Sequence, residues 1–116
     1  MQRKIMIITV LFCLFAATVS AGTVYLAWDP CTDNPDGIRI YASKSANVEA
    51  IPANLIAEIT PGTETTAHVQ SLLGRYHFVA TAFVVDPVEG VLESAKSNEV
   101  TTVVKPNSII NLHFAQ

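Results

Sequence analysis

The sequence is poor in cysteine and in positive charge, and these two shortages exclude several classes of protein. Its 116 residues hold two cysteines, and seven lysines and arginines stand against ten acids. Nucleic acids and anionic membranes bind basic surfaces, so a formal charge of −3 argues against both as partners. No cysteine–histidine pair has the spacing of a zinc site, and we expect neither a metal ion nor another cofactor.

The longest uncharged apolar run lies at the N-terminus and predicts an export signal. Arg3 and Lys4 precede this run, and Val19-Ser20-Ala21 fits the small-residue pattern that signal peptidase cleaves. We therefore expect a signal peptide over 1–21 and one domain over 22–116, located outside the cell, in the periplasm or at the cell surface. The run has about 15 residues, whereas a membrane span needs about 20, so membrane contact is expected only if the signal stays uncleaved.

The expected mature chain keeps one cysteine. Cys13 leaves with the signal, so Cys31 has no partner for an intramolecular disulfide and is either a free thiol or half of an intermolecular disulfide. Asp29 and Asp33 lie close to Cys31 in sequence and oppose thiolate formation, so a reactive thiol is not expected. The mature chain carries five cations and ten acids, a formal charge of −5.

Alternation of apolar and polar residues with period two dominates the remaining chain, and no pattern of helical period appears. Turn residues separate the alternating segments at a spacing of roughly 8–12 residues, which predicts an all-β chain folded as an antiparallel sandwich. The predicted strands lie near 23–28, 38–43, 55–59, 65–72, 76–85 and 97–104, with a further apolar run over 108–114.

Five motifs in order resemble those of a fibronectin type III-like domain, an immunoglobulin-like sandwich. They read VYLAWDP, IRIYAS, TTAHVQSL, GRYHFVATAF and ESAKSNEV. The likeness is to small exported proteins of bacterial or phage type that carry one such domain. It implies that Trp28 is the core tryptophan and Tyr76 the tyrosine-corner residue. The predicted core consists of Val24, Leu26, Trp28, Ile38, Ile40, Val69, Leu72, Tyr76, Phe78 and Ala80.

One departure from the family concerns the first strand. The family usually begins with a strand before the tryptophan strand, and almost nothing lies between Gly22 and Val24. A missing strand leaves a sheet edge open, and an open edge invites pairing. We expect this strand to be missing, or replaced by the extra C-terminal strand over 105–116 of the same chain or a neighbour. The residues of this assembly strand are Ile109, Ile110, Leu112 and Phe114.

The first long loop partly resembles a calcium-binding loop. Thr32, Asn34, Asp36 and Gly37 follow its spacing, but Thr32 replaces the first aspartate and Ser43 the final glutamate. Two of the strongest ligands are therefore missing, and we expect the acidic and amide side chains to cap a turn instead.

Catalysis has little support in the sequence. His68, His77 and His113 fall on three different predicted strands. G-x-S-x-G, H-E-x-x-H and a glycine-rich phosphate loop are absent, so we expect no enzyme activity.

A second loop, predicted over 84–96, is unusually rich in apolar residues. Loops at one end of such sandwiches often bind partners, and this loop would lie at the same end as 29–37. The alternative is that the loop folds back and covers Phe83. The predicted binding surface consists of Asp33, Asn34, Asp36, Val88, Glu89, Val91 and Leu92.

The predicted function is that of a non-catalytic exported module for protein interaction, adhesion or structure. One alternative is a self-assembling subunit, whose copies are joined by strand addition at the open edge. Another is an accessory domain that binds a cell-surface glycan. Glycan binding requires an exposed aromatic platform, for which the candidates are Tyr25, Tyr41 and Phe83.

Overall fold

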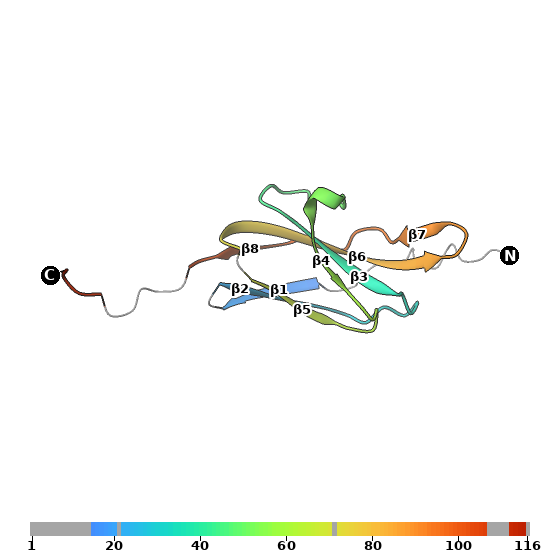
Figure 1. Cartoon of the computed structure of the whole chain (residues 1–116), viewed down its shortest axis with the longest axis horizontal. Coiled ribbons are helices and arrows are strands. Elements are labelled where there is room, and N and C mark those ends of the chain that lie inside the picture. The colour runs from blue at the N-terminus through green and yellow to red at the C-terminus, as the bar shows by residue number, and fades with distance from the viewer. Residues whose placement is uncertain (1–14, 21, 71, 107–111, 116) are drawn as a thin grey trace.

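Two antiparallel sheets pack face to face in the computed structural model (Figure 1), which describes residues 15–20, 22–70, 72–106 and 112–115. The three-stranded sheet has the order β1-β2-β5, with β1 at Phe15–Ser20, β2 at Thr23–Trp28 and β5 at Thr66–Gln70. The second sheet has the order β4-β3-β6-β7, and β8 also pairs with β6. These five strands are β3 at Gly37–Ser43, β4 at Leu55–Ile59, β6 at Gly74–Asp86, β7 at Gly90–Glu93 and β8 at Val100–Val104.

A short 3₁₀ helix, η2 at Pro52–Asn54, precedes β4. Within the described ranges, no helix has the length and apolar character needed to cross a membrane. The predicted all-β sandwich is confirmed, because alternating segments need an opposing apolar layer and the second sheet supplies it.

The core lies between the sheets, where the alternation places it. Every second residue of β2, from Val24 to Trp28, is buried against alternate residues of β3 and β6. The indole N–H of Trp28 donates to the carbonyl of Glu64 at 3.0 Å, which satisfies the polar end of this buried ring. The fully buried cluster includes Val24, Leu26, Trp28, Ile38, Ile40, Phe78 and Ala80, and Val69, Leu72 and Tyr76 pack against it half-buried.

The middle of the central strand β6, from Phe78 to Phe83, is buried on both faces. On the side away from the core, Val79 packs with Tyr41 and Val48, and the segment that follows β3 carries Val48 over the sheet. The Val48 N–H donates to a Glu99 carboxylate oxygen at 2.9 Å, and the Lys96 ammonium donates to the Val48 carbonyl at 2.8 Å. The apolar residues of β6 from Phe78 to Phe83 therefore have partners within the chain on both faces.

Two serines complete the edge of β6 between β7 and β8. The Ser94 N–H donates to the Ala82 carbonyl at 2.8 Å, and Ser94 Oγ accepts from the Ala82 N–H at 2.9 Å. Ser97 makes the same pair of bonds with Ala80, at 2.8 and 2.9 Å. Each serine thus satisfies the backbone N–H and C=O of one alanine of β6, in place of a residue from a paired strand. Buried backbone groups require such partners.

In the full chain, a strand from the predicted signal segment occupies the sheet edge that the expected mature chain leaves open. The edge of β2 is covered by β1, which pairs with it from Phe15↔Trp28 to Ser20↔Thr23. β1 precedes β2 in the chain and runs antiparallel to it. The chain reverses direction between them near Gly22, whose φ of +81° favours glycine. Of the segment assigned to the C-terminal strand, the structure describes 105–106 and 112–115, and these residues lie outside any strand. Leu112 and Phe114 are exposed and outside any strand, and Ile109 and Ile110 lie outside the described residues.

The expectation of one long loop over 84–96 is also corrected. The chain turns at 87–89 and returns as β7, so that Val84 pairs with Leu92 and Val85 with Val91. The turn residues Pro87 and Gly90 mark this hairpin in the sequence, and the apolar residues on each side are its two strands.

Candidate interaction surface

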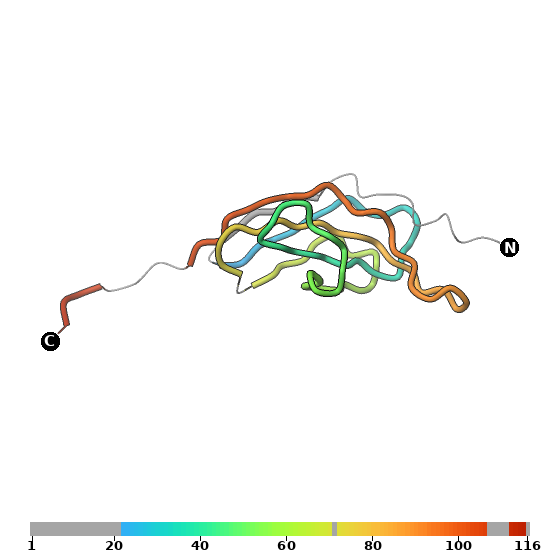
Figure 2. Tube along the Cα trace, turned by 90° about the horizontal axis from the view of Figure 1, so that it is seen from above, coloured from blue at the N-terminus to red at the C-terminus, as the bar shows by residue number. Residues whose placement is uncertain are grey.

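The hairpin of β6 and β7 extends beyond the end of the sandwich (Figure 2), and its turn is fixed by one carboxylate. The side chain of Asp86 accepts the backbone N–H groups of Val88 at 3.0 Å and Glu89 at 2.7 Å. Gly90 then closes the turn with a φ of +85°. An aspartate that caps the following backbone groups, with glycine at a positive φ, is standard turn chemistry. The tip is therefore an ordered part of the fold.

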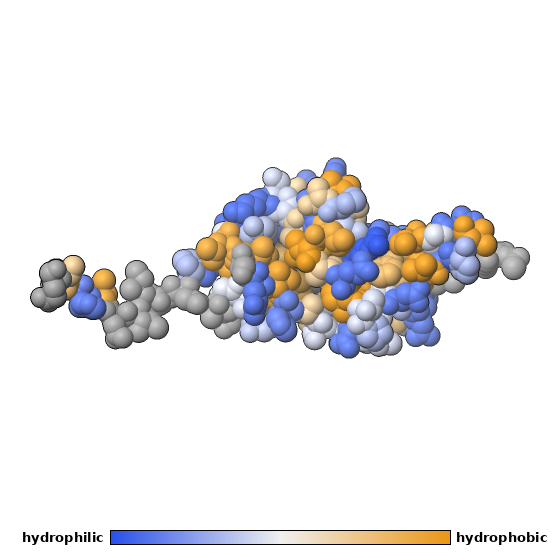
Figure 3. All heavy atoms as spheres, in the orientation of Figure 1, coloured by the Kyte–Doolittle hydropathy of each residue, from blue (hydrophilic) through white to orange (hydrophobic). Residues whose placement is uncertain are grey.

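This hairpin exposes apolar side chains that the fold does not cover. Val88 is 86% exposed at the tip, and the cross-strand pair Val85 and Val91 is 59% and 47% exposed. Hydrophobic residues are visible at this end of the molecule in the space-filling view (Figure 3). Exposed apolar side chains that lie together on an ordered hairpin make this end a candidate interaction surface.

The first loop, 29–36, is attached to the base of this hairpin. The Asp36 N–H donates to the Phe83 carbonyl at 2.8 Å, and the Asp36 carboxylate accepts from the Val85 N–H at 2.7 Å. On its other side the loop packs tightly, since a Cβ on Gly62 would lie 2.1 Å from the Pro35 carbonyl oxygen. Loop and hairpin therefore form one surface, as the sequence placed them.

The predicted binding residues divide by exposure on this surface. Asn34, Asp36, Val88, Glu89 and Val91 are exposed, while Asp33 and Leu92 are half-buried. Asn34 has a φ of +51°, a turn conformation that asparagine tolerates. We call the loop 29–37 together with the hairpin 83–93 the hairpin end. The Asp36 bond to Val85 joins its two parts.

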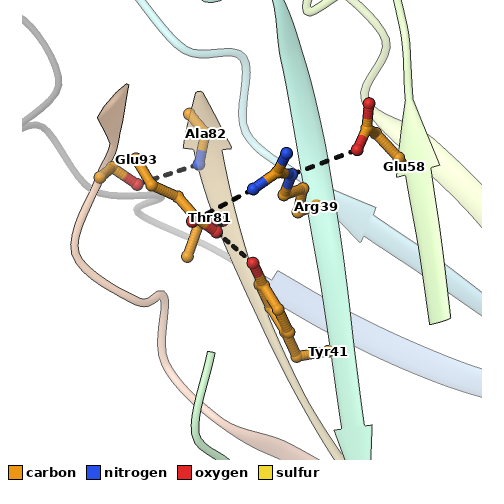
Figure 4. Close-up of polar contacts among 7 residues, drawn as sticks. Arg39, Tyr41, Glu58, Thr81, Ala82 and Glu93 are labelled. Atoms are coloured by element: carbon orange, nitrogen blue, oxygen red, sulfur yellow. Dashed lines mark hydrogen bonds and ion pairs between the residues drawn. The ribbon is translucent and has the colours of Figure 1, made fainter. Parts of the chain in front are cut away.

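A polar network on the outer face of the second sheet holds β7 in place (Figure 4). The Glu93 carboxylate accepts from the Tyr41 hydroxyl, from the Thr81 hydroxyl at 2.5 Å and from the Arg39 guanidinium at 3.4 Å. Arg39 also pairs with Glu58 at 3.2 Å. Burial raises the pKa of Tyr41, and the bond to the negative Glu93 raises it further.

Glu93 anchors the hairpin, a role that the sequence does not predict. Its partners come from β3 and β6, more than ten residues away along the chain. The segment that carries Glu93 was expected to be loop, so nothing in the sequence pointed its side chain at a neighbouring strand.

Cys31 lies half-buried in the hairpin-end loop and packs against the main core. Burial raises the pKa of its thiol, and the charge of Asp33 adds to the increase. The direction agrees with the sequence argument, although burial is the larger cause. The thiol is therefore protonated and slow to react at neutral pH.

Other candidate chemistry is not assembled among the described residues. No three histidine, cysteine or acidic side chains in that part of the chain lie where they could hold one metal ion. His68 lies on β5, and the centroid of its ring is 6.0 Å from the centroid of the Tyr25 ring. His77 lies on β6, and its Nδ1 forms a hydrogen bond of 2.8 Å with the Thr101 hydroxyl. Of the aromatic platform candidates, Tyr25 is exposed and Tyr41 and Phe83 are buried.

With this geometry in view, the chain has a fibronectin type III-like fold. It aligns over 84% of its length with chicken contactin 1 FN1-FN3 domains, at 16% identity and a TM-score of 0.67. A Fn3-like protein from Clostridium thermocellum aligns over 87% of this chain and 96% of its own, at 16% identity and 0.62. A structure described as a myokine aligns over 86% and 99%, at 17% identity and 0.59. The chain spans 31% of the contactin structure.

No family model matches the sequence, and neither does any curated protein. The structural neighbours therefore establish the fold. A fold of this kind hosts many unrelated functions, so a function must be argued from the residues of the candidate surface.

Proposed function

We propose that this protein is an exported, non-catalytic module that binds another protein through the hairpin end. The observation that carries the proposal is the valine group Val85, Val88 and Val91, which is exposed on an ordered hairpin. A rigid apolar surface loses little conformational entropy on binding, so most of its burial contributes to affinity.

The support for the hairpin end is its combination of stiffness and exposure. Asp86 fixes the tip, Asp36 fixes the base, and Glu93 ties β7 to the neighbouring strands. Acidic side chains border the valines at Asp36 and Glu89, so the surface has the apolar centre and polar rim of protein interfaces.

Export is part of the same proposal and rests on the N-terminal sequence. Cleavage after Ala21 would remove β1 and open the edge of β2, and an open edge favours strand addition. The alternative function, assembly by strand addition, therefore depends on this cleavage. Mass spectrometry of the protein purified from the producing cell will show whether its N-terminus is Gly22.

The binding proposal is tested by comparing two exposed valines at opposite ends of the molecule. Val88→Ser removes the apolar tip, and Val103→Ser is the matched control on β8. Wild-type protein and both variants are immobilised and exposed to surface and culture-fluid proteins of the producing organism. We expect one protein to be retained by wild type and by the control, and to be lost with Val88→Ser. Equal capture by all three forms, or none by wild type, would contradict the proposal.

A further inference from the structure

The two ends of the sandwich carry opposite charge. At the hairpin end, the loop contributes Asp29, Asp33 and Asp36, and the hairpin turn contributes Asp86 and Glu89. The lysines and arginines of the described residues lie elsewhere, apart from Arg39, which is paired with Glu58 and Glu93. The hairpin end is therefore strongly negative.

Three cations gather at the opposite end, around the first residue of β6. The Lys44 ammonium would lie 3.2 Å from a Cβ on Gly74, and it lies over the Tyr76 ring at 5.2 Å. Arg75 follows Gly74 directly, and Lys105 follows Val104, which is the register partner of Gly74. We call Lys44, Arg75 and Lys105 the basic end.

Each end also bears exposed apolar side chains. The hairpin end has Val85, Val88 and Val91, whereas the chain beyond the basic end carries Leu112 and Phe114, which are 85% and 93% exposed. Figure 1 shows β8 running toward one end of the molecule, where residues 112–115 are drawn, and the β6–β7 hairpin at the opposite end. The two ends therefore complement each other both in charge and in apolar surface.

We propose that the occupant of the hairpin end is a second copy of this chain, docked head to tail through its basic end. Leu112 and Phe114 of one copy pack on the valines of the next, while Lys105 and its neighbours approach the carboxylates. The inference rests on the proposed function, because it names the partner for that same surface. An interface between two different patches leaves one of each free, so the assembly grows as a linear chain of copies.

Charge complementarity makes the assembly sensitive to salt. The screening length falls from about 10 Å at 0.1 M to about 3 Å at 1 M ionic strength, so added salt weakens attraction between the two ends. Contact of the apolar groups persists under the same conditions, since it does not depend on charge.

The test uses charge reversal at each end, followed in sedimentation velocity. Glu89→Lys makes the hairpin end less negative, and Lys105→Glu makes the basic end less positive. We expect wild type to show a mass that rises with concentration beyond a dimer, and each reversal alone to weaken association about fivefold or more at low salt. An equimolar mixture of the two variants restores one interface, between the unchanged hairpin end of Lys105→Glu and the unchanged basic end of Glu89→Lys, so the two variants associate as a heterodimer.

Further variants separate the apolar contact from charge. Leu112→Ser with Phe114→Ser weakens association as Val88→Ser does, while the control Ile51→Ser, at an exposed position next to η2 and outside both ends, leaves it unchanged. A wild type that stays monomeric, or a mass that stops at a dimer, overturns the proposal. So does a mixture that fails to recover. The proposed function fails separately: a monomeric protein that still captures a foreign partner through Val88 refutes the head-to-tail assembly and leaves that function standing.

Discussion

The two halves of β6 differ in their surroundings although they share one strand and one pattern. From Phe78 to Ala82 the strand lies between β3 and the segment formed by β8 and the two serines, and both faces are covered. From Phe83 to Asp86 it pairs with β7, and β3 ends its pairing at Gly37↔Phe83. The first half holds the sandwich together, and the second half carries apolar residues out to a binding surface.

The largest effect is expected in the first half, at the main core. Phe78 is fully buried, so Phe78→Ala leaves a cavity and should lower the free energy of unfolding by about 3–5 kcal/mol. Val88→Ala in the second half should change it by less than about 0.5 kcal/mol, because Val88 is exposed. Urea unfolding measures both values. Similar losses of unfolding free energy for the two variants would contradict the distinction between a structural half and a surface half of β6.

A smaller effect is expected where the serines complete the edge of the strand. Ser94→Ala leaves the buried N–H of Ala82 without its acceptor, which should cost about 1–3 kcal/mol of unfolding free energy. Ser97→Ala is the matched variant, and it should cost less because its bond to Ala80 is only partly buried. Thermal and urea unfolding of both variants test this order. If neither variant is destabilised, the serine hydroxyls do not stand in for the backbone hydrogen bonds of a neighbouring strand.

The smallest effect concerns the outer network and depends on pH. The pKa of Tyr41 is raised in the folded protein by burial and by Glu93, so folding favours the protonated hydroxyl. Its contribution is complete below the ordinary tyrosine pKa of about 10 and is lost as pH rises through the folded value. The unfolding free energy of wild type should therefore fall relative to Tyr41→Phe above about pH 10, by at most about 1.4 kcal/mol per pH unit. Parallel curves for the two proteins from pH 9 to 11 would contradict this role.

The sequence predicts the sandwich and its core well, since alternation reports burial directly. Val24, Leu26 and Trp28 had only one face to turn inward, and the structure buries all three. The sequence predicts a loop at the hairpin, because turn residues interrupt its apolar side chains. The two short strands also face solvent, so their apolar residues do not show the one-sided alternation of strands that pack on a second sheet. The Glu93 contacts depend on register between distant strands, which no local pattern contains.

The N-terminus gave an incomplete prediction for a different physical reason. A run of apolar and small residues satisfies both the export signal and a strand at the edge of a sandwich. The predicted signal and β1 therefore use the same residues, and composition alone does not separate them. The sequence does predict that the loop 29–37 and the hairpin lie at one end of the sandwich, because turn residues mark both segments, and the Asp36 bond to Val85 joins them. The binding role of their residues stays a prediction.

Hydrogen exchange tests the central claim, that the hairpin end is the binding surface, most directly. The backbone amides of the free protein are compared with those of the protein bound to the partner it captures or to its own copies at high concentration. We predict added protection at 29–37 and 84–92, with little change at β4 and β5. Protection confined to β4 or β5, with the hairpin exchanging as in the free protein, would contradict the account.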